Sequence, residues 1–284
     1  MGEFRTVGVV GAGTMGNGIA HVFALNGYEV TLVDVESEYL QNAVKTIEKN
    51  LGRQVKKEII TPDAQRQTMD RIVTSTEMAS LAGTDFIVEA ATENQKVKFD
   101  IFRQLDEITS SEVILTTNTS SISVTEIAAE TSRPERVAGM HFMNPVPVMK
   151  LVEVVSGLAT NDETLQAIHQ LAESLGKQPV QVQDYPGFIS NRVLMPMINE
   201  AIYALMEDVA EKEAIDEIMQ LGMGHPMGPI QLADFIGLDV CLSIMEVLHE
   251  GFGDDKYRPC PLLRKMVASG RLGRKTGLGF YEYE

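Results

Sequence analysis

The stretch Val7–Asp34 constrains the fold of this 284-residue chain more than any other part of its sequence. A Val-rich run at its start indicates a buried strand, and Gly11, Gly13 and Gly16 follow at the spacing G-x-G-x-x-G. A helical pattern begins at once, and a second apolar run then ends in Asp34. This order of elements predicts the first strand-helix-strand unit of a doubly wound parallel sheet that binds a dinucleotide.

The three glycines of this turn have different physical tasks. Gly11 allows the tight turn, Gly13 lets a pyrophosphate approach the backbone, and Gly16 lets helix and strand pack closely. The N–H groups where the helix begins, at Thr14 and Met15, are then expected to face the phosphates. The alternative is a strand-helix turn that holds no ligand.

The acid that ends the second strand predicts which dinucleotide is bound. Asp34 lies 18 residues beyond Gly16 (34 − 16), close to the spacing at which an acid accepts hydrogen bonds from the adenosine ribose. A carboxylate at this place would repel a 2′-phosphate. The sequence therefore favours NAD over NADP as the cofactor.

Composition and charge argue against several classes of protein. The formal net charge of −16 is wrong for a general nucleic-acid surface, since phosphate backbones require a positive field. Cys241 and Cys260 form neither a metal-binding pair nor a redox motif, so a reducing, cytoplasmic setting without disulfides or a metal is the simplest interpretation. The sequence shows no basic leader and no apolar stretch of membrane-spanning length, so we expect a soluble protein with no membrane partner.

Alternating strand and helix patterns fill residues 1–184. They predict an α/β fold, a mostly parallel, doubly wound Rossmann-type sheet that binds NAD, with a helical hairpin inserted after the second strand. Strands are expected at residues 7–10, 28–33, 71–75, 86–90, 113–117, 137–142, 151–155 and 179–182. The short strands at 71–75 and 86–90 are expected to be buried. Residues 185–284 show helical patterns without a convincing strand pattern, and they predict a second, all-helical domain.

The first helix of the inserted hairpin combines an apolar and a basic face. Apolar residues from Leu40 to Ile59 recur at helical spacing and predict a buried stripe. Basic residues recur along another face of the same helix. They are Lys45, Lys49, Arg53 and Lys57, with Lys56 beside them. These residues form either a site for a polyanionic ligand or a solvated face paired by Glu48 and Glu58.

Polar residues cluster where ligands bind in an open parallel sheet, beyond the carboxyl ends of the strands. Asn118 and Ser120 follow one expected strand. His141 lies near the end of the next strand, and Asn144 follows it in a turn. Glu153 lies in the strand after that, where the turn could place its carboxylate against His141. A carboxylate on one imidazole nitrogen fixes the tautomer and gives a tuned acid/base, whereas the alternative is a satisfied core histidine.

Several sequence blocks together resemble the 3-hydroxyacyl-CoA dehydrogenase family, over essentially the whole chain. Besides the glycine turn, the blocks are EAATE at 89–93, NTSS at 118–121, HFMNPVP at 141–147 and DYPGFISNR at 184–192. The last two are far more specific than the turn. The chain has the length of the stand-alone bacterial members that act on 3-hydroxybutyryl-CoA. Met143 replaces an aromatic residue common in relatives, which should change packing more than chemistry.

The resemblance implies roles for individual residues. His141 corresponds to the catalytic acid/base and Glu153 to the carboxylate that orients it. Ser120 corresponds to the hydroxyl that contacts the reacting oxygen, and Asn191, from the second domain, to an amide near the substrate carbonyls. Positions that correspond to cofactor contacts are Asp34, Glu93, Lys98, Asn118, Ser120, Asn144 and Lys275.

The predicted function is a reversible hydride transfer between NAD and C3 of an (S)-3-hydroxyacyl-CoA, with His141 exchanging the proton of the C3 oxygen. The resemblance also implies that the second domain forms a homodimer or a dimer of dimers. The basic residues expected to bind the CoA phosphates are Lys49, Arg53, Lys56 and Lys57. A dehydrogenase of free hydroxy acids or sugar acids is one alternative, and it needs no distant phosphate site. A non-catalytic NAD-binding protein is the other, and the intact set of catalytic residues argues against it.

Overall fold

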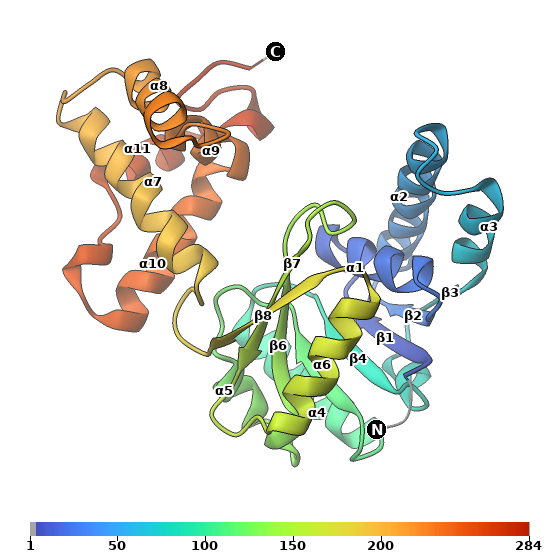
Figure 1. The fold of residues 1–284 in the computed structure, drawn as a ribbon. Helices are drawn as coiled ribbons and strands as arrows, with labels where there is room; N and C mark the ends of the chain where they lie inside the picture. Colours follow the sequence, from blue (N-terminus) through green and yellow to red (C-terminus); the bar gives the residue numbers. More distant parts are fainter. Residues whose placement is uncertain (1–3, 284) are drawn as a thin grey trace. The chain divides into compact units, whose positions relative to one another are not determined.

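The computed structural model describes residues 4–283, and the chain divides into two compact units, Met1–Asp184 (unit 1) and Tyr185–Glu284 (unit 2) (Figure 1). Each unit has a hydrophobic core of its own.

Unit 1 is built on an eight-stranded sheet with the strand order β3-β2-β1-β4-β5-β6-β7-β8. Neighbouring strands run parallel except β6 and β7, which are antiparallel. The strands are β1 (Thr6–Val10), β2 (Glu29–Val33), β3 (Ile72–Ser75), β4 (Phe86–Glu89), β5 (Ile114–Thr117), β6 (Val137–Phe142), β7 (Leu151–Ser156) and β8 (Gln178–Gln183). The predicted mostly parallel, doubly wound sheet is confirmed. Strand order reverses at β1, so the ligand crevice of this fold is expected at the carboxyl ends of β1 and β4.

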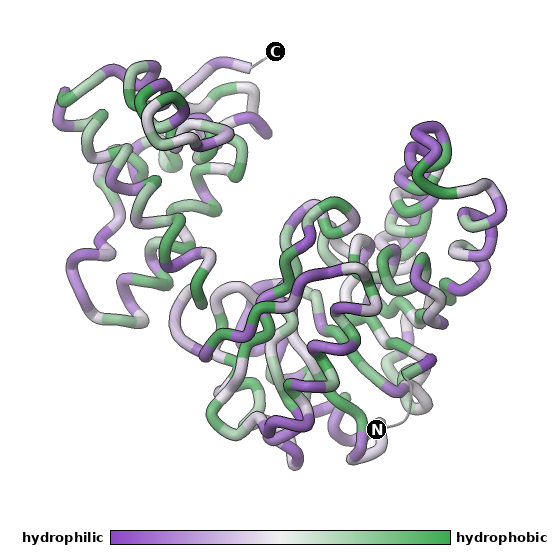
Figure 2. The backbone as a smooth tube through the Cα atoms, in the orientation of Figure 1, coloured by the Kyte–Doolittle hydropathy of each residue, from purple (hydrophilic) through white to green (hydrophobic). Residues whose placement is uncertain are grey.

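Helices cover both faces of the sheet (Figure 1), and the strands at the centre of the sheet are largely hydrophobic (Figure 2) and buried. The helical elements are α1 (Thr14–Leu25), α2 (Ser37–Lys56), α3 (Pro62–Asp70), η1 (Met78–Leu81), α4 (Gln95–Ile108), α5 (Val124–Ala128), η2 (Pro134–Arg136) and α6 (Asp162–Ser174). On one face, α1, α2 and α6 pack through side chains such as Phe23, Ile47 and Ile168. On the other, η1, α4 and α5 pack through Leu81 and Phe102, among others. Burying one side chain of this size, relative to leaving it exposed, contributes roughly 1.5–3 kcal/mol to the free energy of unfolding.

Local side-chain caps fix where several of these helices begin. Thr61, just before Pro62, accepts a hydrogen bond from the Ala64 N–H, as expected for a helix with Pro in its first turn. Asn94, Ser123 and Asn161 cap α4, α5 and α6 in the same way. The predicted helical hairpin is α2 and α3, which lies beyond β2 and β3 in Figure 1.

Two details of the expected pattern are wrong. Residues 71–75 were expected to form a buried strand, but β3 is the edge strand of the sheet and Val73 is 60% exposed. The apolar stripe of α2 was expected to reach Ile59, but the helix ends at Lys56 and Ile59 is 66% exposed. In α4, Lys98 is buried, whereas the neighbouring Val97 is 39% exposed and lines a cavity.

Unit 2 is helical, as predicted. Its elements are α7 (Ser190–Met206), α8 (Lys212–Met223), α9 (Pro229–Ile236), α10 (Leu238–Phe252), η3 (Asp255–Tyr257), α11 (Pro261–Ala268) and η4 (Arg274–Thr276). Two buried carboxylates hold the end of the chain. Asp216 accepts the Tyr281 hydroxyl at 2.9 Å, and Asp234 accepts the backbone N–H groups of Phe280 and Tyr281 at 2.9 and 2.8 Å.

Candidate active site

The glycine turn after β1 has the geometry that its sequence predicts. Gly11 has a φ of 100°, and a Cβ there would lie 2.5 Å from the carbonyl oxygen of Ala90. A Cβ on Gly16 would lie 1.7 Å from the carbonyl oxygen of Gly11, so only glycine permits this contact between helix and turn. A Cβ on Gly13 would meet nothing within 4 Å. The backbone at Gly13 therefore lies open to a ligand, in front of an α1 N-terminus that has no side-chain cap.

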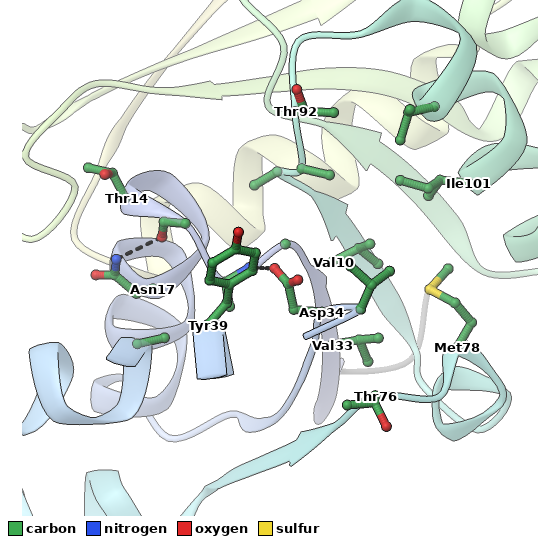
Figure 3. Close-up of a pocket in the computed structure, with 18 of the residues that line it drawn as sticks. Val10, Thr14, Asn17, Val33, Asp34, Tyr39, Thr76, Met78, Thr92 and Ile101 are labelled. Carbon is green, nitrogen blue, oxygen red and sulfur yellow. Dashed lines mark hydrogen bonds between the residues drawn. The ribbon is translucent and has the colours of Figure 1, made fainter. Parts of the chain in front are cut away.

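A cavity of about 780 Å³ lies over this turn (Figure 3). Asp34 stands in it at the end of β2, and its Oδ2 accepts the Ala12 N–H at 2.7 Å. Asp34 and Tyr39 both line this pocket, as Figure 3 shows. The apolar walls of the cavity come from Val10, Val33, Met78, Val97 and Ile101. Donors at a helix N-terminus, an acid and apolar walls together fit an adenine dinucleotide.

A second group of polar residues lies beyond β5, in the loop Asn118–Ser121, which we call the serine loop. Glu93 accepts hydrogen bonds from the Ser120 N–H at 2.7 Å and from the Thr119 hydroxyl at 2.9 Å. Burial raises the pKa of Glu93, but the Lys98 ammonium and these hydrogen bonds outweigh it and leave the pKa below its usual value. Glu93 is thus an anion that holds the serine loop.

Lys98 is almost completely buried, with 1% of its surface exposed. Its ammonium binds both carboxylate oxygens of Glu89, at 2.8 and 2.9 Å, and lies 3.4 Å from Glu93 Oε2. Glu89 also accepts the Ala91 N–H and the Thr117 hydroxyl, each at 2.7 Å. Lys98 therefore faces two carboxylates, and it is absent from the lining of the cavity over the glycine turn.

His141 and Glu153 form a buried pair. The two residues lie opposite each other in the antiparallel ladder of β6 and β7, and His141 Nδ1 is 2.8 Å from Glu153 Oε2. Exposures are 8% for His141 and 2% for Glu153. This contact orients the ring and leaves Nε2 as the nitrogen suited to exchanging a proton with a substrate. Phe142, the next residue, donates its N–H to Asn118 Oδ1 at 2.9 Å, which ties β6 to the serine loop.

The connection between β6 and β7, residues 143–150, includes Asn144, which is exposed. Lys177 fixes this connection because its ammonium donates to the carbonyl oxygens of Val146 and Met149, at 2.5 and 2.7 Å. His21 of α1 is fully buried. Its burial, followed by the charge of Lys177, lowers the pKa of His21 to about 4.

The basic residues of the helical hairpin are exposed. Lys49, Arg53 and Lys56 lie on α2, and Lys57 follows its last residue. Glu48 and Glu58 were the possible partners, but within the described range 4–283 no carboxylate lies within salt-bridge distance of any of these four cations.

Two predicted site residues lie in unit 2. Asn191 is in the first turn of α7, and its N–H donates to the Gly187 carbonyl at 3.2 Å. Lys275 lies in η4, where its ammonium is 2.6 Å from an Asp239 oxygen. The part of the chain that the structure describes has no group of three or more His, Cys, Asp and Glu side chains arranged to hold a metal. Among the same residues, no helix is both long and apolar enough to span a membrane.

Sequence reasoning missed Glu89 and Tyr39 as candidate site residues. Glu89 ends the strand Phe86–Glu89, in which every residue is buried. A carboxylate at the carboxyl end of a fully apolar strand is a signal that could have identified it. Tyr39 lies in the first turn of α2, where no sequence pattern marks it, and only the structure places it on the wall of the cavity.

The chain matches family profiles over nearly its whole length. Residues 6–185 match "3-hydroxyacyl-CoA dehydrogenase, NAD binding domain", and residues 187–283 match "3-hydroxyacyl-CoA dehydrogenase, C-terminal domain".

Individual relatives agree with these matches. The chain is 54% identical over 279 residues to a 3-hydroxybutyryl-CoA dehydrogenase of Bradyrhizobium diazoefficiens, covering 98% of this chain and 95% of the relative. It is 56% identical over 276 residues to a probable 3-hydroxybutyryl-CoA dehydrogenase of Deinococcus radiodurans, covering 97% and 99%. The crystal structure of (S)-3-hydroxybutyryl-CoA dehydrogenase from Ralstonia eutropha superposes with a TM-score of 0.97 at 52% identity, covering 99% of this chain and 100% of that one.

Proposed function

The chain belongs to the 3-hydroxyacyl-CoA dehydrogenase family, and from this premise we propose that its own substrate is (S)-3-hydroxybutyryl-CoA, oxidised reversibly to acetoacetyl-CoA. It is an NAD-dependent dehydrogenase of 3-hydroxyacyl-CoA esters. The choice of a four-carbon acyl group and of the S configuration rests on the relatives named above. The single observation that favours catalysis over a non-catalytic role is the buried His141–Glu153 contact of 2.8 Å.

In this proposal His141 is the acid/base. Glu153 holds Nδ1, so Nε2 takes the proton of the C3 hydroxyl during oxidation and returns it to the ketone oxygen during reduction. The Ser120 hydroxyl contacts the same oxygen, and Glu93 and Asn118 hold the loop that bears it. We assign the amide of Asn191 to the substrate carbonyls. The bound nicotinamide supplies the hydride acceptor or donor.

The glycine turn and Asp34 are proposed to hold the adenosine half of NAD. The open backbone at Gly13 and the N–H groups of Thr14 and Met15 suit a pyrophosphate, and the Asp34 carboxylate suits a ribose with both hydroxyls free. We further assign Glu93, Lys98, Asn118, Asn144 and Lys275 to the cofactor side of the site. Because Lys98 is only 1% exposed, its proposed contribution to cofactor binding is indirect: its ammonium holds the Glu93 carboxylate in place. Residues 1–184 are thus the proposed NAD domain and residues 185–284 the proposed substrate and dimerisation domain.

The exposed cations Lys49, Arg53, Lys56 and Lys57 are proposed to bind the phosphates of CoA, and the face of α2 supports this. Thr46 lines the cavity over the glycine turn, and Arg53 follows it seven residues later, on the same helix face. Lys45 lies on the same face one turn before Lys49, but it lines a separate depression beside β3 and is therefore not assigned to the phosphate site.

Neutralising this face tests the CoA assignment. A variant with Ala at positions 49, 53, 56 and 57 should have a KM for acetoacetyl-CoA raised roughly tenfold, since each exposed contact contributes a few tenths of a kcal/mol. Its KM should also depend less on salt. Turnover of a truncated pantetheine thioester should stay near the wild-type value, and Lys45→Ala is the matched control. Equal losses with the full and the truncated substrate would mean that the face is only solvated.

The activity itself is tested by the decay of NADH absorbance with acetoacetyl-CoA, run beside NADPH and beside acetoacetate without CoA. The proposal expects turnover with NADH and the thioester only. Faster turnover of the free acid would favour a dehydrogenase of hydroxy acids. Absence of turnover in every combination, with NADH still bound, would favour a non-catalytic protein.

We propose that a second copy of the chain covers an apolar face of unit 2. Ile218, Leu221 and Met223 of α8 are 60%, 79% and 64% exposed, and Phe235 of α9 is 55% exposed. Several large apolar side chains exposed on two helices that contact each other mark an interface more often than a free surface. A cytoplasmic location is also proposed, consistent with two buried free thiols, Cys241 and Cys260, and cell fractionation tests it.

A further inference from the structure

The buried ion network around Lys98 lies at the point of the sheet where the strand order reverses. Glu89 is the last residue of β4, in register with Val10 of β1 and Thr117 of β5. Both neighbouring strands end there as well, one before the glycine turn and the other before the serine loop. Glu89 is fully buried, so its carboxylate contacts protein groups and not solvent. It lies between the glycine turn, on the proposed cofactor side of unit 1, and the serine loop, on the proposed substrate side.

The hydrogen bonds of Glu89 connect these two sides. One oxygen accepts the N–H of Ala91, a residue that lines the cavity over the glycine turn. The other accepts the hydroxyl of Thr117, which in turn accepts the N–H of Thr119 at 3.2 Å. Both oxygens bind the Lys98 ammonium. Each oxygen of the Glu89 carboxylate therefore accepts two hydrogen bonds, and all of the donors lie next to the glycine turn or the serine loop.

Lys98 shares its charge unequally between two carboxylates. It lies at 2.8 Å from Glu89 and at 3.4 Å from Glu93, so its tighter contact is with the buried partner. Glu93 is left free to turn its oxygens toward the serine loop, where the Ser120 N–H lies at 2.7 Å. Without the Glu89 charge, a buried ammonium would have Glu93 as its sole counterion and would draw it away from that loop.

We propose that Glu89 is a positioning residue for catalysis, because it holds Lys98 at a distance that lets Glu93 fix the serine loop. The inference rests on the proposed function, since it assigns to this loop the hydroxyl that contacts the reacting oxygen. Glu89 itself touches neither substrate nor cofactor, and its effect on turnover passes through Lys98.

Glu89→Gln is the informative change, because the amide keeps the size and one acceptor of the carboxylate while removing its charge. In the full-length enzyme, kcat with NADH and acetoacetyl-CoA should fall about 10- to 100-fold, the loss that follows from a misplacement on the order of 1 Å. The Kd for NADH, measured by fluorescence, should change far less. Glu107→Gln is the matched control, because it removes an exposed carboxylate from the same helix as Lys98 and should leave kcat unchanged.

The double variant with Lys98→Met shows whether the effect passes through Lys98. If it does, the double variant should lose no more kcat than Lys98→Met alone. Losses that multiply would overturn the proposal, as would a folded Glu89→Gln enzyme with wild-type kcat and only a lower melting temperature. If Glu89→Gln does not fold, the comparison of Lys98→Met with the double variant decides alone. Failure of the wild-type enzyme to turn over acetoacetyl-CoA would instead refute the proposed function.

Discussion

Acidification should destabilise unit 1 through His21. This histidine is fully buried in α1, and its burial, together with the charge of Lys177, lowers its pKa from 6.5 to about 4. The unfolded chain therefore takes up a proton between these two pH values that the folded chain does not. The sign follows directly: the folded state loses stability as the pH falls from about 6.5 to about 4, and this loss ends below the folded pKa.

The size of the effect comes from the same shift. Each pKa unit corresponds to about 1.4 kcal/mol, so the full loss is on the order of 3 kcal/mol, and about 2 kcal/mol of it is already present at about pH 5. His21→Leu removes the titrating ring together with its Nδ1, which has no hydrogen-bond partner. Carboxylates whose pKa values are lowered in the folded chain, such as Asp85 and Asp106, are present in both proteins and cancel in the comparison.

The assay is urea unfolding of the full-length chain, followed by circular dichroism at about pH 7.5 and about pH 5. The free energy of unfolding should drop by about 2 kcal/mol less in His21→Leu than in the wild type. His225→Gln, a change in a turn of unit 2, is the control. Parallel pH dependences in wild type and His21→Leu would refute the reasoning, whatever the variant does to stability at neutral pH.

Three further changes test the site and the assembly. Asp34→Ala should lose much of the preference for NADH over NADPH, because the repulsion of a 2′-phosphate is gone, and parallel kinetics with an unchanged ratio would contradict this. His141→Ala should lower kcat roughly 10²- to 10⁴-fold with NADH binding retained, and Glu153→Gln should also lower kcat. A double variant that loses the product of the two single losses would show that they do not act as one unit. Leu221→Glu should shift the sedimentation coefficient toward that of a monomer, and an unchanged profile would place the interface elsewhere.

The parts of the fold that sequence predicts well are those fixed by local pattern. Gly11 and Gly16 are required because a Cβ at either position would overlap the backbone, Gly13 keeps the backbone open to a ligand, and the position of Asp34 follows from the length of one helix and one strand. Helix starts such as Thr61-Pro62 are equally local. These features depend on contacts between residues that are close in sequence.

The features that sequence did not predict depend on which strands and helices meet. The exposure of Val73 results from the edge position of β3, which is a property of strand order and not of the segment itself. A lysine such as Lys98 ordinarily indicates a solvent-facing position. The apolar periodicity of α4 does not predict that Lys98 is buried between the carboxylates of Glu89 and Glu93. The burial of His21 likewise depends on elements far away in the chain.

The pairing of His141 with Glu153 also says which changes this enzyme can accumulate over evolution. Side chains alternate between the two faces of a strand, so an insertion or deletion in the connection 143–150 that shifts the pairing of β6 with β7 by one residue would turn Glu153 to the opposite face. Exchanging one residue for another in that connection has no such effect. Descendants of this sequence should therefore vary the composition of the connection and keep its length. A new loop grafted between β6 and β7 should likewise keep the register that places Glu153 opposite His141.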